Sequence, residues 1–95
     1  MTYRPEPINT TGVELPATVI ELPELLAKNA HYLWARDRIK QSWSYGPQRY
    51  DAKKHNPCLV PYEELPDAER QYDRNNSMET LKAIVKLGYR IEKKA

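Results

Sequence analysis

The chain of 95 residues contains no phenylalanine, a single cysteine and only three glycines. Because Cys58 has no second cysteine to pair with, an intrachain disulfide is excluded. The glycines stand apart at positions 12, 46 and 88, so the sequence has no glycine-rich phosphate-binding loop. It also has no run of about 18 apolar residues and no charged-then-apolar leader, which indicates neither a membrane span nor secretion. We therefore expect a cytoplasmic protein.

Net charge is low as well, at +2 at pH 7. A nucleic-acid-binding domain would show a clustered basic face, so we expect neither nucleic acid nor a membrane as partner. The length predicts one small domain over residues 1–95, which can bury only a modest share of its surface and would gain stability from an oligomer interface. The aromatic content consists of seven tyrosines and two tryptophans, which are favoured at wet interfaces because they join an apolar body to a polar group.

The stretch from Pro23 to Pro47 organises the rest of the chain. Proline suits the first turn of a helix and disfavours helical backbone in the residue before it, so these two prolines bracket a predicted helix over residues 22–43 that ends in the aromatic turn WSYGP. Its helical period separates two faces. The face that we expect to be buried carries Leu22, Leu25, Leu26 and Leu33. The opposite face carries Ala27, His31, Trp34 and Arg38, and it needs a partner of its own.

The remaining segments predict smaller elements. Residues 1–13 form an extended arm lying on the surface, anchored by apolar residues between positions 13 and 22, and residues 44–56 form a polar loop. We expect a brief strand at 58–60, a short helix at 65–70, a last helix that is capped by Asn76 and stopped by Gly88 in a left-handed conformation, and a short closing strand around Tyr89 and Ile91. The fold class is thus mainly α (α+β), with two principal helices, short β-strands and an extended N-terminal arm.

The sequence offers little for catalysis or metal binding. His31, His55 and Cys58 are the candidate soft metal ligands, but they lack the spacing of a zinc site. Cys58 stands between a proline and a leucine, which is more typical of a small buried residue than of a nucleophile. We expect no catalytic residue, no metal and no cofactor, and therefore no enzyme.

The face with His31, Trp34 and Arg38 leaves three interpretations open. It is a second packing surface against the loop 48–59, a site where Trp34 stacks a ring while arginine side chains hold an anionic group, or a surface for self-association. The second and third interpretations are compatible if the pocket forms between two subunits. The candidate ligand-binding residues are Trp34, His31, Arg38, Trp43, Tyr45 and Arg49.

Several motifs in a fixed order resemble the ryanodine receptor repeat domain over nearly the whole chain. They are YRPEP at 3–7, LAKNAHYLWARDRI at 26–39, WSYGP at 43–47, NPCLVPY at 56–62, ETLK at 79–82 and LGY at 87–89. The chain departs from the family at Ser42, where glycine is usual, and at Tyr50, where aspartate is common.

The resemblance implies a largely helical unit with a little β structure. In the giant calcium channels such repeats occur as tandem pairs related by an approximate twofold axis, whereas this single copy is similar to the stand-alone versions of bacteria and phages. It implies that a homodimer restores the pairing through an isologous interface. It also implies that the cleft between paired repeats takes a nucleotide-like or aromatic ligand, lined by the tryptophan that matches Trp34. The alternative is a purely structural module that docks a protein partner without a small ligand.

Overall fold

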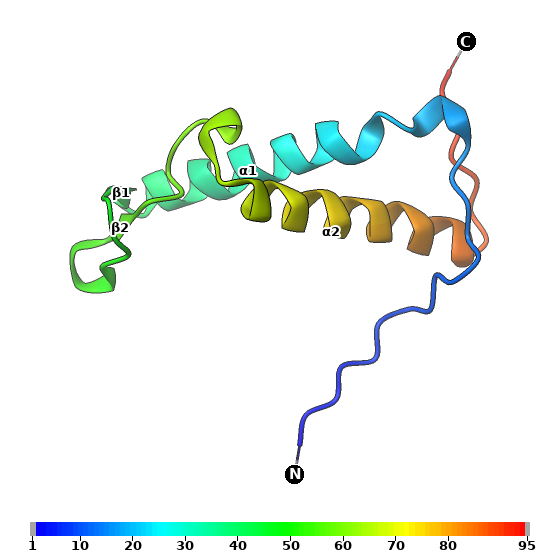
Figure 1. The fold of residues 1–95 in the computed structure, drawn as a ribbon, viewed down its shortest axis with the longest axis horizontal. Helices are drawn as coiled ribbons and strands as arrows, with labels where there is room; N and C mark the ends of the chain where they lie inside the picture. The colour runs from blue at the N-terminus through cyan, green and yellow to red at the C-terminus, as the bar shows by residue number, and fades with distance from the viewer. Residues whose placement is uncertain (1, 95) are drawn as a thin grey trace.

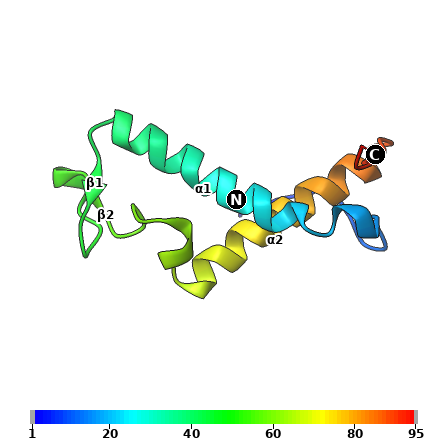
Figure 2. The ribbon, with the colours of Figure 1, turned by 90° about the horizontal axis from the view of Figure 1, so that it is seen from above.

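A computed structural model describes residues 2–94 of the chain, and it consists mainly of two helices (Figure 1). The elements in chain order are the 3-10 turn η1 (Ala17–Val19), helix α1 (Leu22–Lys40), strand β1 (Ser44–Tyr45), the 3-10 turn η2 (Asp51–Lys53), strand β2 (His55–Asn56), the 3-10 turn η3 (Tyr62–Glu64) and helix α2 (Asp67–Lys86). The expected mainly α fold with two principal helices and short strands is confirmed. Figure 2 shows that α1 and α2 cross each other, with β1 and β2 lying beyond one end of α1.

Both helices end in the same hydrogen-bonded turn. After α1, the amide of Ser42 donates to the carbonyl of Ile39 and that of Trp43 to Arg38, while Ser42 takes a left-handed φ of 70°. This pair of bonds satisfies carbonyls that a helix end leaves free, and it is the Schellman motif. The helix therefore stops at Lys40 and not at Trp43 as predicted. The left-handed backbone also explains why glycine would suit position 42.

The second helix ends in the same way, at the predicted left-handed glycine. Gly88 has a φ of 102°, and the amide of Tyr89 donates to the carbonyl of Ile84. The predicted start at Asn76 is wrong, because α2 runs without a break from Asp67 and includes both expected helices. Asn76 lies inside α2, where its backbone carbonyl accepts a hydrogen bond from the Thr80 hydroxyl. No proline or glycine between Asp67 and Gly88 interrupts the helix, so the weak helical preference of asparagine does not end it.

The predicted burial of the leucine face of α1 is wrong. Leu25, Leu26 and Leu33 are exposed, and Leu25 retains 56% of its accessible surface. The buried face carries Pro23, Ala27 and His31, because α2 and η3 pack on that side. Ala27 is fully buried, and its small side chain allows Tyr62 and Leu65 to approach the helix closely. The core thus lies where α1 meets the η3 turn and not along the leucines.

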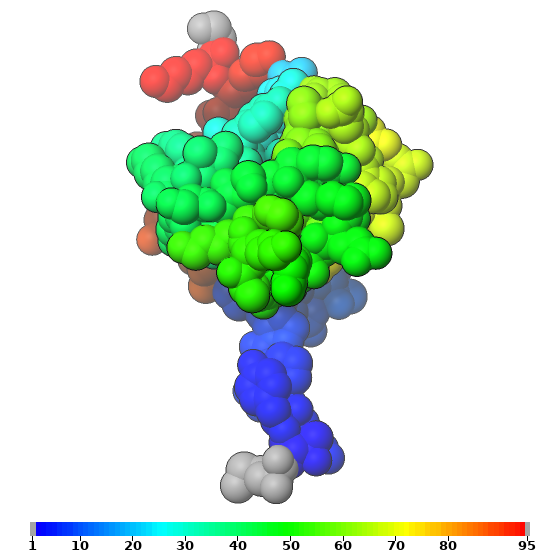
Figure 3. Space-filling model, turned by 90° about the vertical axis from the view of Figure 1, so that its left-hand side faces the viewer, coloured from blue at the N-terminus to red at the C-terminus, as the bar shows by residue number. Residues whose placement is uncertain are grey.

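The β structure also differs from the prediction. The short strands are β1 and β2, which pair in parallel with Ser44 opposite His55, whereas residues 58–60 and 89–91 form no strand. A β-carbon at Gly46 would lie 2.5 Å from the β-carbon of His55, so the close approach of the two segments requires glycine there. Figure 3 shows this segment covering the end of the molecule, with the N-terminal arm projecting away from it.

The N-terminal arm is extended as predicted, but residues 2–6 do not pack against the helices. Figure 1 shows them leading away from the helices. The arm meets the helical body at Thr10, whose hydroxyl donates a hydrogen bond of 2.6 Å to the carboxylate of Glu79 in α2. After it, Val13 and Leu15 are partly buried, and Val19 in η1 is buried. At the other end of the chain, Lys93 pairs with Glu21, which holds the C-terminal segment beside the start of α1.

Candidate functional site

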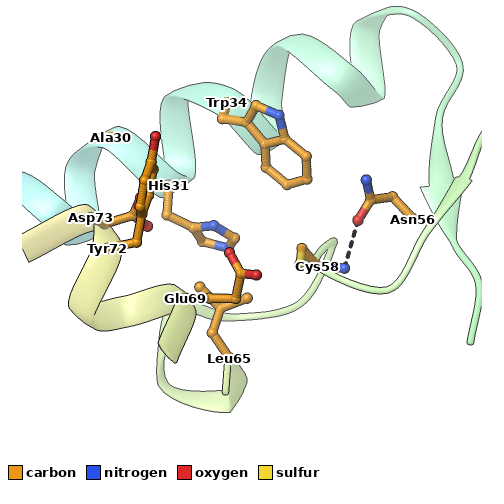
Figure 4. Close-up of a pocket in the computed structure, with 9 residues that line it drawn as sticks. All are labelled: Ala30, His31, Trp34, Asn56, Cys58, Leu65, Glu69, Tyr72 and Asp73. Atoms are coloured by element: carbon orange, nitrogen blue, oxygen red, sulfur yellow. Dashed lines mark hydrogen bonds between the residues drawn. The ribbon is translucent and has the colours of Figure 1, made fainter. Parts of the chain in front are cut away.

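A cavity of about 330 Å³ opens between α1, α2 and the segment that joins β2 to α2 (Figure 4). It includes Trp34 and lies at the face of α1 that the sequence indicated. Its lining residues are Ala30, His31, Trp34, Asn56, Cys58, Leu65, Glu69, Tyr72 and Asp73. The volume is at the lower end of the range for small-molecule sites, which suits one ring system better than a whole nucleotide.

His31 is a structural residue of this site as well as part of its wall. It is only 5% exposed, and its Nε2 lies 2.7 Å from the carbonyl oxygen of Val60. Because a carbonyl oxygen only accepts, Nε2 carries the hydrogen and donates it. This bond ties the segment before η3 to α1, so His31 holds the floor of the pocket in place.

Two aromatic side chains stand on different sides of the cavity. The Trp34 ring stacks on the His31 ring, with centroids 5.7 Å apart and planes inclined by 29°. Tyr72 comes from α2 and is 64% exposed. In Figure 4, Trp34 lies over the cavity, and Tyr72 stands beside Asp73 at its α2 side. This arrangement offers a flat apolar face to a planar ligand.

The α2 side of the cavity is acidic. Glu69 and Asp73 lie one helical turn apart and both line the cavity. Burial raises the pKa of the Asp73 carboxyl and the charge of Glu69 raises it further, while His31 opposes the shift. None of the nine lining residues is a lysine or an arginine. The site thus carries negative charge where the sequence had suggested positive charge.

Cys58 is not placed for nucleophilic chemistry. Burial raises the pKa of its thiol, and the nearby charges of Glu69 and Asp73 raise it further. A thiol that stays protonated at neutral pH is a poor nucleophile. Its backbone amide donates a 2.8 Å hydrogen bond to Oδ1 of Asn56, which shapes the turn at the rim of the cavity. Among residues 2–94 no three histidine, cysteine or acidic side chains lie close enough together to hold a metal ion.

Only two of the six candidate ligand-binding residues lie at the cavity. His31 and Trp34 line the cavity, whereas the other four lie outside it. Arg38 lies 5.6 Å from the centre of the Trp43 ring and donates a hydrogen bond to Gln41. The two remaining residues are Tyr45, exposed in β1, and Arg49, which pairs with Asp51 at 3.0 Å beside a second depression. The stacking surface and the expected cations are therefore separate.

Sequence reasoning missed the contribution of α2, namely Glu69, Tyr72 and Asp73. Tyr72 and Asp73 follow Glu69 by three and four residues, so the three side chains share one helix face. This pattern can be recognised in the sequence. The signal was lost because the expected helices ended at 70 and began again at 76, which left two of the three residues unassigned. A single helix over this stretch would have shown one face carrying an aromatic and two acidic residues.

The comparison with known families agrees with the resemblance seen in the motifs. No helix within residues 2–94 is long and apolar enough to cross a membrane. A family model described as the RyR domain matches residues 3–93, which is nearly the whole chain. This match includes both helices, the paired strands and every residue that lines the cavity. The chain belongs to the RyR domain family.

Proposed function

We propose that this protein is a non-enzymatic binding module that holds the planar ring of a nucleotide-like or aromatic ligand against Trp34. The observation that carries the proposal is the cavity between α1 and α2, which is lined by the Trp34 indole on one side and by Tyr72 on another. Stacking on an aromatic residue contributes roughly 1–3 kcal/mol for each nucleic-acid base, and it tolerates different rings because every base has a flat face. The family resemblance supports the same function, because it implies that the ligand cleft of paired repeats is lined by the tryptophan that matches Trp34.

The proposal includes a homodimer that completes the cleft. The leucines of α1 that the fold leaves exposed support self-association, because Leu26 and Leu33 line one open depression between α1 and α2 and Leu25 is exposed beside them in sequence. Single exposed apolar residues are ordinary, but contiguous ones mark interaction surfaces. A twofold pair would bury this face in both copies and add to the stability of a small domain.

The second candidate function is a protein–protein interaction module without a small ligand. The same exposed leucines favour it, since they would dock an apolar helix of another protein as well as a second copy. The two candidates differ in what happens at Trp34. A ligand-binding module loses its ligand when the indole is removed, whereas a docking module that uses the leucines does not depend on it.

The test is a calorimetric titration of the purified protein with adenine and guanine nucleotides, including cyclic ones. We expect saturable binding that is lost in Trp34→Ala, with the helical circular-dichroism signal retained. Trp43→Phe is the matched control, because Trp43 lies outside the cavity, and it should bind like the natural protein. Light scattering gives the mass in parallel. A dimer without binding to any nucleotide would support the interaction module, and a monomer without binding would contradict the ligand-binding function and the homodimer.

A further inference from the structure

Two open depressions on the surface of α2 adjoin each other. The first lies between the N-terminal arm and α2, and Ile8 borders it from the arm. The second lies between α1 and α2, and Leu26 and Leu33 border it from α1. Asn76 and Thr80 of α2 line both depressions, so the two form one groove along this helix. The chain's own arm thus borders one end of the groove, while the leucines at the other end are left exposed.

The arm beyond this contact is stiff. Its sequence from position 3 to 7 is YRPEP. Proline fixes its own backbone and holds the residue before it in an extended conformation, so the segment from Arg4 to Pro7 cannot turn back on itself. Pro7 borders α2, and the residues before it lead away from both helices (Figure 1). Tyr3 keeps 85% of its accessible surface. The outer arm therefore stays off its own groove and is available to another molecule.

The outer arm and the groove are chemically complementary. Asp73 borders the groove from α2 and is half-buried, yet within residues 2–94 it forms no ion pair. Arg4 of the arm forms none either within the same residues. The α1 side of the groove offers Leu26 and Leu33 to an apolar side chain. Because adjacent side chains of an extended segment point to different sides, Tyr3 reaches the leucines of one wall when Arg4 reaches Asp73 on the other.

The lengths of the arm and the groove agree as well. An extended, proline-rich segment from Tyr3 to Pro7 spans about 12 Å. Along α2, the part of the groove from Asp73 to Thr80 rises by about 10 Å. The root of the arm and the groove lie on the same side of the molecule, since their depressions adjoin. A twofold pair that meets through this side places each arm over the groove of the other copy.

Resting on the homodimer of the proposed function, we infer that two copies exchange their N-terminal arms, so that residues 3–5 of each copy occupy the groove between α1 and α2 of the other. Tyr3 covers the exposed leucines, and Arg4 pairs with Asp73 across the interface. A stiff arm loses little conformational entropy when it docks, which favours this mode of pairing. Asp73 also lines the Trp34 cavity, so the arm of the second copy supplies a positive charge beside the acidic wall of that site.

The experiment measures the dissociation constant of the dimer by sedimentation over a concentration series. We expect Arg4→Glu and Asp73→Arg each to weaken the dimer roughly tenfold to hundredfold, because each change places like charges together at two contacts. An equal mixture of the two variants should dimerise like the natural protein. In the mixed pair, the new carboxylate of one copy meets the new guanidinium of the other, and the natural pair remains at the second contact. Lys94→Glu is the matched control, since it makes the same charge change in the exposed C-terminal segment, away from the arm (Figure 1).

Tyr3→Ser tests the same interface without any change in the helical body. Tyr3 lies in the exposed arm, so the helical circular-dichroism signal should be unchanged. We expect the dimer to weaken at least roughly tenfold, because a buried aromatic anchor is lost from both contacts. This result holds the inference to a test even where Asp73→Arg fails to fold.

The outcomes separate the arm exchange from the proposed function. Single variants that dimerise like the natural protein would refute the exchange and leave the homodimer to another face. Weakened single variants whose mixture is not restored would also refute it, since the arm then does not reach the second copy. A natural protein that is monomeric at every concentration would overturn the exchange and the homodimer together, while the nucleotide titration still decides the ligand-binding function.

Discussion

Replacing His31 by phenylalanine tests whether this residue is a structural support or a ligand contact. The change keeps a ring of similar shape in the buried position but removes the hydrogen that Nε2 donates to the carbonyl oxygen of Val60 over 2.7 Å. The carbonyl would then be left without a partner in a part-buried position. The segment before η3 would lose its hydrogen bond to α1, although the pocket would keep its apolar wall.

The magnitude follows from the cost of an unsatisfied polar group, which is about 1–3 kcal/mol. For a domain of this size each kcal/mol lowers the melting temperature by roughly 4–8 °C. We therefore expect His31→Phe to melt about 5–20 °C below the natural protein. His31→Gln keeps a side-chain donor and should recover part of the loss.

The assay is thermal and urea unfolding followed by circular dichroism at 222 nm. Tyr32→Phe is the matched control, since Tyr32 is the exposed neighbour of His31 on α1 and should unfold like the natural protein. A His31→Phe variant of unchanged stability that has lost ligand binding would refute the structural role. It would show instead that the imidazole contacts the ligand directly.

Three further predictions test the turn after α1, the core and an ion pair. Ser42→Gly should raise the free energy of unfolding by up to about 1 kcal/mol in urea titrations, because glycine removes the cost of a left-handed residue, although it adds entropy to the unfolded chain. Leu81→Ala should lower it by about 2–5 kcal/mol, because Leu81 is 5% exposed, whereas Leu87→Ala, at a site 63% exposed, should change it by less than about 0.5 kcal/mol. The hydrogen bond from Arg74 lowers the pKa of Glu24, so this contribution to stability is complete above the usual value of 4.5 and is lost as the pH falls through the lowered pKa. Glu24→Gln should therefore be less stable than the natural protein at pH 7, and the difference should shrink as the pH falls below 4.5. Equal effects of the two leucine changes, or a Glu24→Gln loss that is independent of pH, would contradict these assignments.

Local signals in the sequence predicted the start of α1 and the end of α2. Pro23 opens α1 in its first turn, and Gly88 takes the left-handed conformation that closes α2. These features depend on the backbone preferences of single residues, which act over one helical turn. The predicted end of α1 is wrong because Ser42 adopts a left-handed conformation, which the presence of a serine does not predict.

The candidate site could be predicted only in part. The stripe on α1 correctly located His31 and Trp34 on a face that meets other segments, and both line the cavity. The arginines were added because a cation suits a nucleotide, yet Arg38 and Arg49 interact with their own neighbours along the chain. The acidic wall comes from a helix far away in the sequence, and no pattern within α1 could indicate it.

The sequence by itself determined the helical class, the position at which α2 ends, and membership of a family whose motifs extend along nearly the whole chain. Only the tertiary structure decided which face of α1 is buried. Hydrophobicity favours the leucines, but a helix buries the face that another element reaches, and α2 and η3 reach the face of Ala27. The charge of the cavity was decided in the same way, because it depends on which residues of α2 lie opposite Trp34 once the two helices cross.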